Sequence, residues 1–115
     1  MEYRDAATGL LAVGVFDDSD SRVIRVSGEL DLSTVPSLER ELEAAISRPD
    51  RGVVVDLSDL EFIDSTGIAV LVRAMGECDG EVRLKFVPSR SEAVVRVLDM
   101  TGVSGRMQLA DGIAS

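Results

Sequence analysis

The sequence predicts a single α/β domain, with a mixed, mainly parallel sheet of four to five strands and helices mainly on one face. With 115 residues, the chain is long enough for one hydrophobic core and too short for two. Strand-like and helix-like segments alternate along most of it, a pattern that produces parallel strand pairs. The first two strand-like segments are separated only by a short polar turn, so we expect that pair to be antiparallel.

The first expected element is a β-hairpin. Residues 1–9 carry no periodic pattern and are interpreted as an N-terminal tail, so the domain is assigned to residues 10–115. Residues 10–16 and 22–27 have the composition of strands, and a polar turn lies between them. Residues 28–32 are expected to leave the sheet, because Gly and Asp favour turns.

An amphipathic helix and a buried strand should follow. Ser33 or Thr34 can cap the helix, and Pro36 suits its first turn, where a missing N–H group is tolerated. The apolar positions share one helical face: Leu38, Leu42, Ala45 and Ile46. Residues 49–52 end this helix. Residues 53–57 form a continuous β-branched run, which is typical of a central strand.

The second half of the chain repeats this alternation. Residues 64–67 open a helix that should close at residues 79–80. Residues 81–87 alternate between polar and apolar side chains, as a half-buried strand does. A third helix is predicted over residues 92–100, followed by a weak strand at residues 107–109.

One face of the sheet should meet water. Arg83 and Lys85 lie on the same side of the strand predicted at residues 81–87. We therefore expect the helices to cover mainly the other face.

The composition indicates a protein partner. Hydrophobic residues make up 45% of the chain and charged residues 29%, as in a soluble globular domain. Lys and Arg total 12 against 21 Asp and Glu, which gives a net charge of −9. This charge repels phosphate backbones and anionic lipid, so the sequence argues against binding to nucleic acid or membranes. A protein with a basic surface is the more natural partner.

Several chemistries are excluded by residue content. The chain has no histidine and a single cysteine, Cys78, so it cannot form a Ser-His-Asp or Cys-His catalytic site, a zinc cage or an internal disulfide. We predict no metal and no cofactor. Residues 1–5 are polar, without the features of a secretory signal, and the longest apolar stretch is too short to span a bilayer. The prediction is a cytoplasmic protein.

Residues 60–67 contain the polar segment with the most chemical content. Ser65 lies where a loop becomes the start of a helix, and free N–H groups at such a position favour an anion such as phosphate. Phosphorylation of an exposed serine there would add a charge of about −1.5 to −2. Spacing alone, however, favours ordinary helix capping by Asp64, Ser65 and Thr66. A switch is permitted at this point but not required.

Three segments resemble the STAS family of bacterial anti-sigma factor antagonists, in the order in which the family has them. Residues 26–31 (VSGELD) resemble its strand and GELD opening. Residues 53–58 followed by residues 62–67 (FIDSTG) resemble its central strand and its phosphorylation motif. Residues 98–103 are similar to the end of a later helix in the family. Together these segments extend over about residues 10–103.

The resemblance implies a partner switch and no enzymatic activity. The unphosphorylated protein would bind an anti-sigma factor that is also a serine kinase of the GHKL ATPase type, and thereby free a sigma factor. The kinase would phosphorylate Ser65, the first serine after the motif aspartate, and the complex would separate. A phosphatase would then reset the cycle. A monomer is expected when the protein is free.

The resemblance also implies a partner-binding surface, to which we assign Asp31, Asp64, Ser65, Thr66, Gly67 and Ile68. Asp31 is as well explained by a solvated turn after a strand. Thr66 is a helix cap or a second phosphorylation site. Gly67 allows close approach of a partner or is merely tolerated in the first turn. Apolar residues at helical spacing, such as Ile68, more often belong to a core.

Three alternatives stay open. The chain could be a STAS scaffold or a regulatory module of another signalling or transport complex. It could be a small hydrolase or phosphotransferase that uses Ser65 with Asp64 or Asp31, although the usual Gly-rich loop and nucleophile elbow are missing. It could also be a receiver domain phosphorylated on Asp56, although the acidic pair and the lysine of such a site are not correctly placed.

Overall fold

The computed structural model describes residues 10–48, 50–78 and 84–110. In chain order, its elements are β1 (Leu11–Asp18), β2 (Ser21–Leu30), α1 (Val35–Ile46), β3 (Gly52–Ile63), α2 (Ser65–Glu77), β4 (Leu84–Val87), α3 (Glu92–Met100) and a short 3-10 helix (Ser104–Arg106). The predicted tail, residues 1–9, lies outside the described residues.

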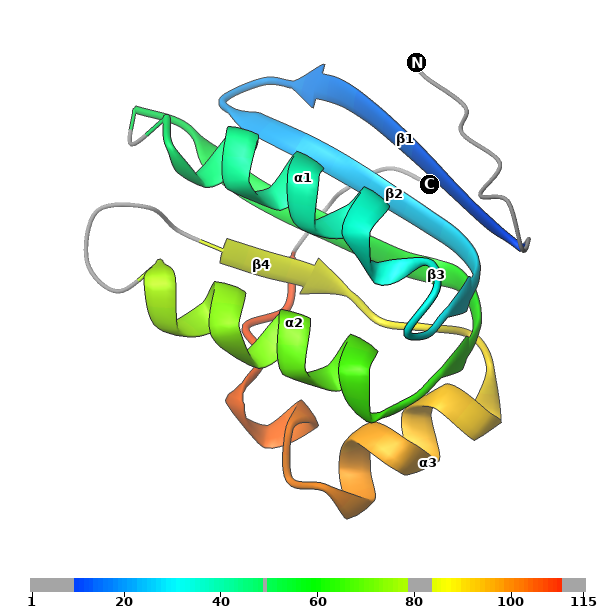
Figure 1. Ribbon diagram of the computed structural model, residues 1–115. Coiled ribbons are helices and arrows are strands. Elements are labelled where there is room, and N and C mark those ends of the chain that lie inside the picture. Colours follow the sequence, from blue (N-terminus) through cyan, green and yellow to red (C-terminus); the bar gives the residue numbers. More distant parts are fainter. Residues whose placement is uncertain (1–9, 49, 79–83, 111–115) are drawn as a thin grey trace.

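The sheet has the predicted mixed topology. Its four strands are ordered β1-β2-β3-β4; β1 and β2 are antiparallel, and the other two pairs are parallel. Figure 1 shows α1 and α2 side by side across one face of this sheet. The weak strand predicted near the C-terminus is present only as an isolated parallel bridge between Phe86 and Leu109. The predicted fold class is confirmed.

The core lies between the sheet and the helices. The strands contribute alternating apolar residues, among them Leu11, Val13, Ile24, Val26, Val53, Val55, Leu57, Leu84 and Phe86. The helices cover them with Val35, Leu38, Leu42, Ala45, Val70, Leu71, Ala74, Val94 and Leu98. Aliphatic side chains thus supply nearly all of the buried surface, as a chain with 3% aromatic residues requires.

Two strands extend further than predicted. Residues 28–32 were expected to leave the sheet, but β2 continues to Leu30 and β3 continues to Ile63, where the two residues are paired. The register shifts between Arg25 and Ser27 and again between Gly28 and Glu29. In both shifts β3 carries one more residue than β2, so these bulges let the two strands stay paired as far as Leu30 and Ile63.

Other boundaries agree more closely. The hairpin turn is shorter than predicted, since only Ser19 and Asp20 separate β1 from β2. Helix α3 has the predicted bounds, and the hydroxyl of Ser91 caps it by accepting a hydrogen bond from the N–H of Val94. Helix α2 ends at Glu77, so its predicted end at residues 79–80 and the first part of the predicted strand at residues 81–87 lie outside the described residues.

A partly buried ion pair lies on the sheet face opposite the core cluster. Asp56 is only 4% exposed, and its carboxylate accepts a hydrogen bond of 3.1 Å from Arg25 Nε. The guanidinium of Arg25 also lies over the ring of Phe16, 5.3 Å from its centroid. Burial would raise the pKa of Asp56, but hydrogen bonds from Ser58 and Arg25 together hold it below the usual range. Asp56 is therefore part of the packing of the sheet.

Candidate functional site

The predicted site residues converge at one edge of the sheet because β2 and β3 are parallel. Leu30 and Ile63 are register partners near the ends of these strands, and the N–H of Asp64 donates to the carbonyl of Leu30 at 3.1 Å. The loop that begins at Asp31 therefore lies beside the loop that begins at Asp64. This is the edge at which open α/β sheets commonly bind their ligands.

The carboxylate of Asp64 caps α2. It accepts hydrogen bonds from the N–H groups of Thr66 at 2.9 Å and Gly67 at 3.1 Å, and from the hydroxyl of Thr66. Burial would raise the pKa of Asp64, but these hydrogen bonds together hold it below the usual range. Asp64 is thus a negatively charged helix cap at neutral pH.

The side chains of Ser65 and its neighbour Thr66 differ in exposure and in hydrogen bonding. Ser65 is the first residue of α2, and its side chain is exposed. Within the part of the chain that the structure describes, its hydroxyl has no hydrogen-bond partner. The hydroxyl of Thr66, by contrast, donates to Asp64. Of the two adjacent hydroxyl groups, only that of Ser65 is free to react without breaking the cap.

The structure corrects one expectation about this helix start. Free N–H groups were expected to favour a phosphate, but those of Thr66 and Gly67 are already bound to the Asp64 side chain, and that of Ile68 donates to the Asp64 carbonyl at 3.0 Å. A phosphate on Ser65 would therefore lie beside an ionised carboxylate without those donors.

Asp31 builds the turn that precedes α1. Its carboxylate accepts hydrogen bonds from the N–H groups of Ser33 at 3.0 Å and Thr34 at 3.2 Å, and from the Ser33 hydroxyl at 2.8 Å. The Ser33 hydroxyl bond and the other hydrogen bonds lower the pKa of Asp31. Thr34 occupies the N-cap position of α1, but its side chain makes no capping bond there; its buried hydroxyl donates to the Glu29 carbonyl at 2.9 Å.

Gly67 and Ile68 face the interior more than the surface. Gly67 is buried, and a Cβ atom there would lie 2.8 Å from Ile63 Cγ1 and 2.9 Å from Leu30 Cγ. The glycine therefore lets α2 pack closely against the ends of β2 and β3, which explains it without a partner. Ile68 is half-buried against the core. Asp31, Asp64 and Thr66 are half-buried, and Ser65 alone among the six is exposed.

Sequence reasoning did not single out Leu32. Its side chain is 72% exposed, in the loop that lies beside the loop beginning at Asp64. A leucine between Asp31 and Ser33, in a polar turn without helical or strand periodicity, was the available signal. It places an apolar side chain in the same pair of loops as Ser65, where a protein partner could bury it.

The structure offers little for metal or thiol chemistry. In the described ranges, no group of three His, Cys, Asp or Glu side chains is positioned to hold a metal ion. Cys78 is buried, and burial together with nearby Glu77 raises the pKa of its thiol, which makes it a poor nucleophile. None of the described helices is long and apolar enough to cross a membrane.

Replacing the Asp64 cap should reduce stability in a pH-dependent manner. We expect Asp64→Ala to lower the free energy of unfolding by about 1 kcal/mol at pH 7. Because the pKa of Asp64 is depressed in the folded state, the carboxylate's contribution is present above the ordinary Asp pKa of about 3.9 and is lost as pH falls through the folded-state value. Urea unfolding of both proteins at pH 7 and pH 3 should show the difference narrowing at the lower pH. An equal difference at both pH values would contradict this role.

Comparisons with known proteins agree on one family. The family model described as "Mlab, STAS domain" matches residues 13–109. An anti-sigma-B factor antagonist of Staphylococcus aureus is 30% identical over 92 residues, which cover 77% of this chain and 82% of that protein. One from Staphylococcus epidermidis is 28% identical over 102 residues, which cover 89% and 94% of the two chains.

Solved structures show the same fold. The crystal structure of an anti-sigma factor antagonist from Mycobacterium paratuberculosis superimposes with a TM-score of 0.82 at 28% identity, over 96% of this chain and 92% of that one. The anti-sigma factor antagonist SpoIIAA in its unphosphorylated form has a TM-score of 0.68 at 24% identity, over 88% and 90% of the two chains. The resemblance seen in the sequence is confirmed: this chain belongs to the STAS domain family of anti-sigma factor antagonists.

Proposed function

We propose that this protein binds an anti-sigma factor that is also a serine kinase, and that phosphorylation of Ser65 ends the binding. The proposal rests chiefly on one observation. Ser65 is exposed at the start of α2 with a free hydroxyl, whereas the hydroxyl of Thr66 is bound to Asp64. In the transfer, the Ser65 oxygen forms a bond to the γ-phosphorus of ATP, ADP leaves, and the hydroxyl proton is released.

Charge supplies the reason why phosphate would act as an off-switch. Phosphorylation adds about −1.5 to −2 charges to Ser65. The site already contains the ionised carboxylate of Asp64, and the whole chain carries −9. An interface that covers Ser65 and the exposed side chain of Leu32 would have to remove this dianion from water, which is unfavourable without a matching cation.

The remaining parts of the proposed cycle rest on family membership. The kinase is a GHKL-type ATPase, and binding to it frees a sigma factor. A phosphatase hydrolyses the phosphoserine and restores the binding form. The protein itself is a monomer when free and acts in the cytoplasm through binding, without catalysing a reaction.

A second candidate function is a STAS subunit of another complex. It is favoured by the description of the matching family model, which carries the name Mlab. Such a subunit would bind its partner without receiving a phosphate, so the same experiment separates the two functions.

The test is a phosphorylation assay with purified proteins. The chain is incubated with ATP, Mg²⁺ and each candidate GHKL-type anti-sigma kinase from the same genome, and intact mass and peptide mapping identify any modified residue. We expect one phosphate on Ser65, lost in Ser65→Ala. Ser47→Ala, a change at an exposed serine just after α1, should leave the modification intact. Binding without phosphate would favour the second function, and the absence of both binding and phosphate would remove the first.

A further inference from the structure

The solvent-exposed face of α2 begins at Ser65 and continues to the end of the helix. Four exposed residues follow one another at intervals of four along this helix: Ser65, Ala69, Arg73 and Glu77. Each interval of four residues turns the stripe by about 40° around the helix axis, and 12 residues span about 18 Å. The stripe therefore runs obliquely from Ser65 toward the side of α2 where Arg73 and Glu77 lie next to the buried residues Val70 and Ala74. A partner that covers Ser65 therefore has a continuous surface along α2 to follow.

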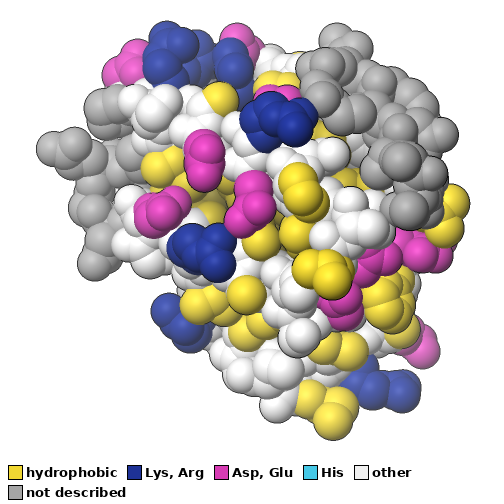
Figure 2. Space-filling model, viewed as in Figure 1, with side chains coloured by type: hydrophobic (Ala, Val, Ile, Leu, Met, Phe, Trp, Pro, Cys, Tyr) yellow, Lys and Arg dark blue, Asp and Glu magenta, His cyan; other side chains and the backbone are white. Residues whose placement is uncertain are grey.

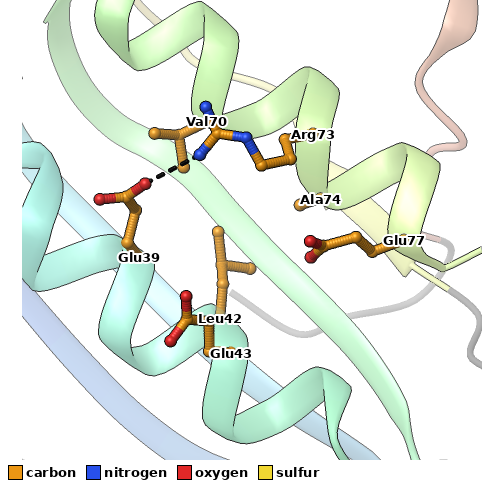
Figure 3. Close-up of a pocket in the computed structure, with 7 residues that line it drawn as sticks. All are labelled: Glu39, Leu42, Glu43, Val70, Arg73, Ala74 and Glu77. Carbon is orange, nitrogen blue, oxygen red and sulfur yellow. Dashed lines mark hydrogen bonds and ion pairs between the residues drawn. The ribbon is translucent and has the colours of Figure 1, made fainter.

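This face borders a groove between α1 and α2. The groove is lined by Glu39, Leu42 and Glu43 from α1 and by Val70, Arg73, Ala74 and Glu77 from α2 (Figure 3). Its volume is about 30 Å³. A nucleotide or drug-sized ligand needs a pocket of about 300 Å³ or more, and a single water needs about 10–15 Å³. The groove therefore admits only the end of a side chain.

The groove is suited to a cation. Its base is formed by the buried residues Leu42, Val70 and Ala74, and its rim carries three glutamates and one arginine. Figure 2 shows acidic side chains gathered around a basic one where the two helices lie side by side. Arg73 crosses from α2 to donate a 3.0 Å hydrogen bond to Glu39. Glu43 and Glu77 have no ion-pair partner among the described residues.

We infer that the anti-sigma factor docks along the exposed face of α2 and places an arginine or lysine side chain in the groove between α1 and α2, where Glu43 and Glu77 receive it. The inference rests on the proposed function for the identity of the partner. Three observations favour a basic protein surface as the occupant of the groove. The groove is too small for a metabolite, and its unpaired side chains are anionic. The chain as a whole also carries a net charge of −9.

Substitution of Arg73 tests the inference, because it should change the affinity for the partner in the opposite direction to substitution of the glutamates. The guanidinium of Arg73 already forms an ion pair with Glu39. It therefore repels an incoming cation and partly neutralises the negative charge of the groove. Removing Arg73 should therefore strengthen partner binding, whereas removing the charges of Glu43 and Glu77 should weaken it. A merely structural role for these exposed side chains would not produce opposite effects.

The first experiment does not depend on the proposed function. NMR spectra of the ¹⁵N-labelled full chain are recorded during titration with Nα-acetyl-arginine amide, and Nα-acetyl-citrulline amide serves as the uncharged control probe. We expect amide shifts concentrated at residues 39–43 and 70–77 with the arginine probe alone. The probe concentration needed to saturate these shifts should be higher for the Glu43→Gln/Glu77→Gln variant and lower for Arg73→Gln. Equal or scattered shifts in all variants would overturn the inference, whether or not Ser65 is phosphorylated.

The second experiment measures affinity for the anti-sigma kinase that modifies Ser65, by calorimetry at two salt concentrations. We expect about tenfold weaker binding for Glu43→Gln/Glu77→Gln and about threefold tighter binding for Arg73→Gln, with a smaller difference at high salt. Glu92→Gln, on the exposed part of α3, is the matched control and should change nothing. Unchanged affinity in the groove variants, with Ser65 still phosphorylated, would overturn the inference and leave the proposed function standing.

Discussion

Phosphorylation of Ser65 should lower the affinity for the anti-sigma factor by about a hundredfold or more. The phosphate would bring about two negative charges into a desolvated interface, a change that costs several kcal/mol when no cation compensates it. About 2.7 kcal/mol corresponds to a hundredfold change in the dissociation constant. The site offers no such compensation, because the N–H groups of Thr66 and Gly67 are already bound to the ionised Asp64.

This effect is measured by comparing the phosphorylated and unphosphorylated protein in calorimetric titrations with the anti-sigma factor. Ser65→Asp adds a single charge and should produce a smaller loss, whereas Ser65→Ala should retain binding close to that of the unmodified protein. The far-UV circular dichroism of all forms should be the same, because the hydroxyl of Ser65 makes no hydrogen bond within the described fold. Equal affinities before and after phosphorylation would refute the switch.

Gly28→Ala should destabilise the fold by about 3 kcal/mol or more, the largest stability effect that we expect from a single methyl group. Gly28 has φ of 101°, in a region of backbone conformation that residues with a side chain rarely adopt. A Cβ atom there would lie 1.7 Å from the carbonyl oxygen of Leu10. The same oxygen accepts a hydrogen bond of 2.8 Å from the N–H of Glu29, so the backbone cannot move away without losing that bond.

Urea unfolding provides the measurement, and Gly76→Ala is the matched control. Gly76 lies near the end of α2, and a Cβ atom added there meets nothing within 4 Å. Alanine has a higher helix propensity than glycine, so this control should raise the free energy of unfolding by up to about 1 kcal/mol. The two Gly→Ala changes are therefore expected to have opposite signs. A neutral Gly28→Ala would mean that the backbone of β2 at Gly28 can relax.

Much of the fold could be predicted because its signals are local. Alternation of apolar residues marks strands, spacing of three and four marks helices, and a polar residue before each apolar stripe marks a helix start. Helix α3 is an example, since its predicted bounds are those of the structure. The mixed sheet followed from the order of these elements alone. Strand ends were less predictable, because pairing with a neighbouring strand decided them.

The candidate site shows the same division. Asp64 and Ser65 could be selected from the sequence because their motif is contiguous and resembles the phosphorylation motif of the family, whereas spacing alone favoured ordinary helix capping. The exposed Leu32 and the groove beside Arg73 could not, since each depends on which segment lies opposite. Helix capping by Asp64 was one of the two interpretations that the sequence allowed, and the structure shows that this cap takes the N–H groups of Thr66 and Gly67 that were expected to favour a phosphate on Ser65.

By itself, the sequence determined the order of the elements, the helix-start motif that contains Ser65, and the acidic character that suits a basic protein partner. The tertiary structure alone decided which loops meet, where β2 and β3 end, and which of two adjacent hydroxyl groups is free. The physical reason is that propensity and capping act between residues close in the chain. Strand pairing, close packing at Gly67 and the alignment of α1 with α2 are set by contacts between segments that are distant in sequence.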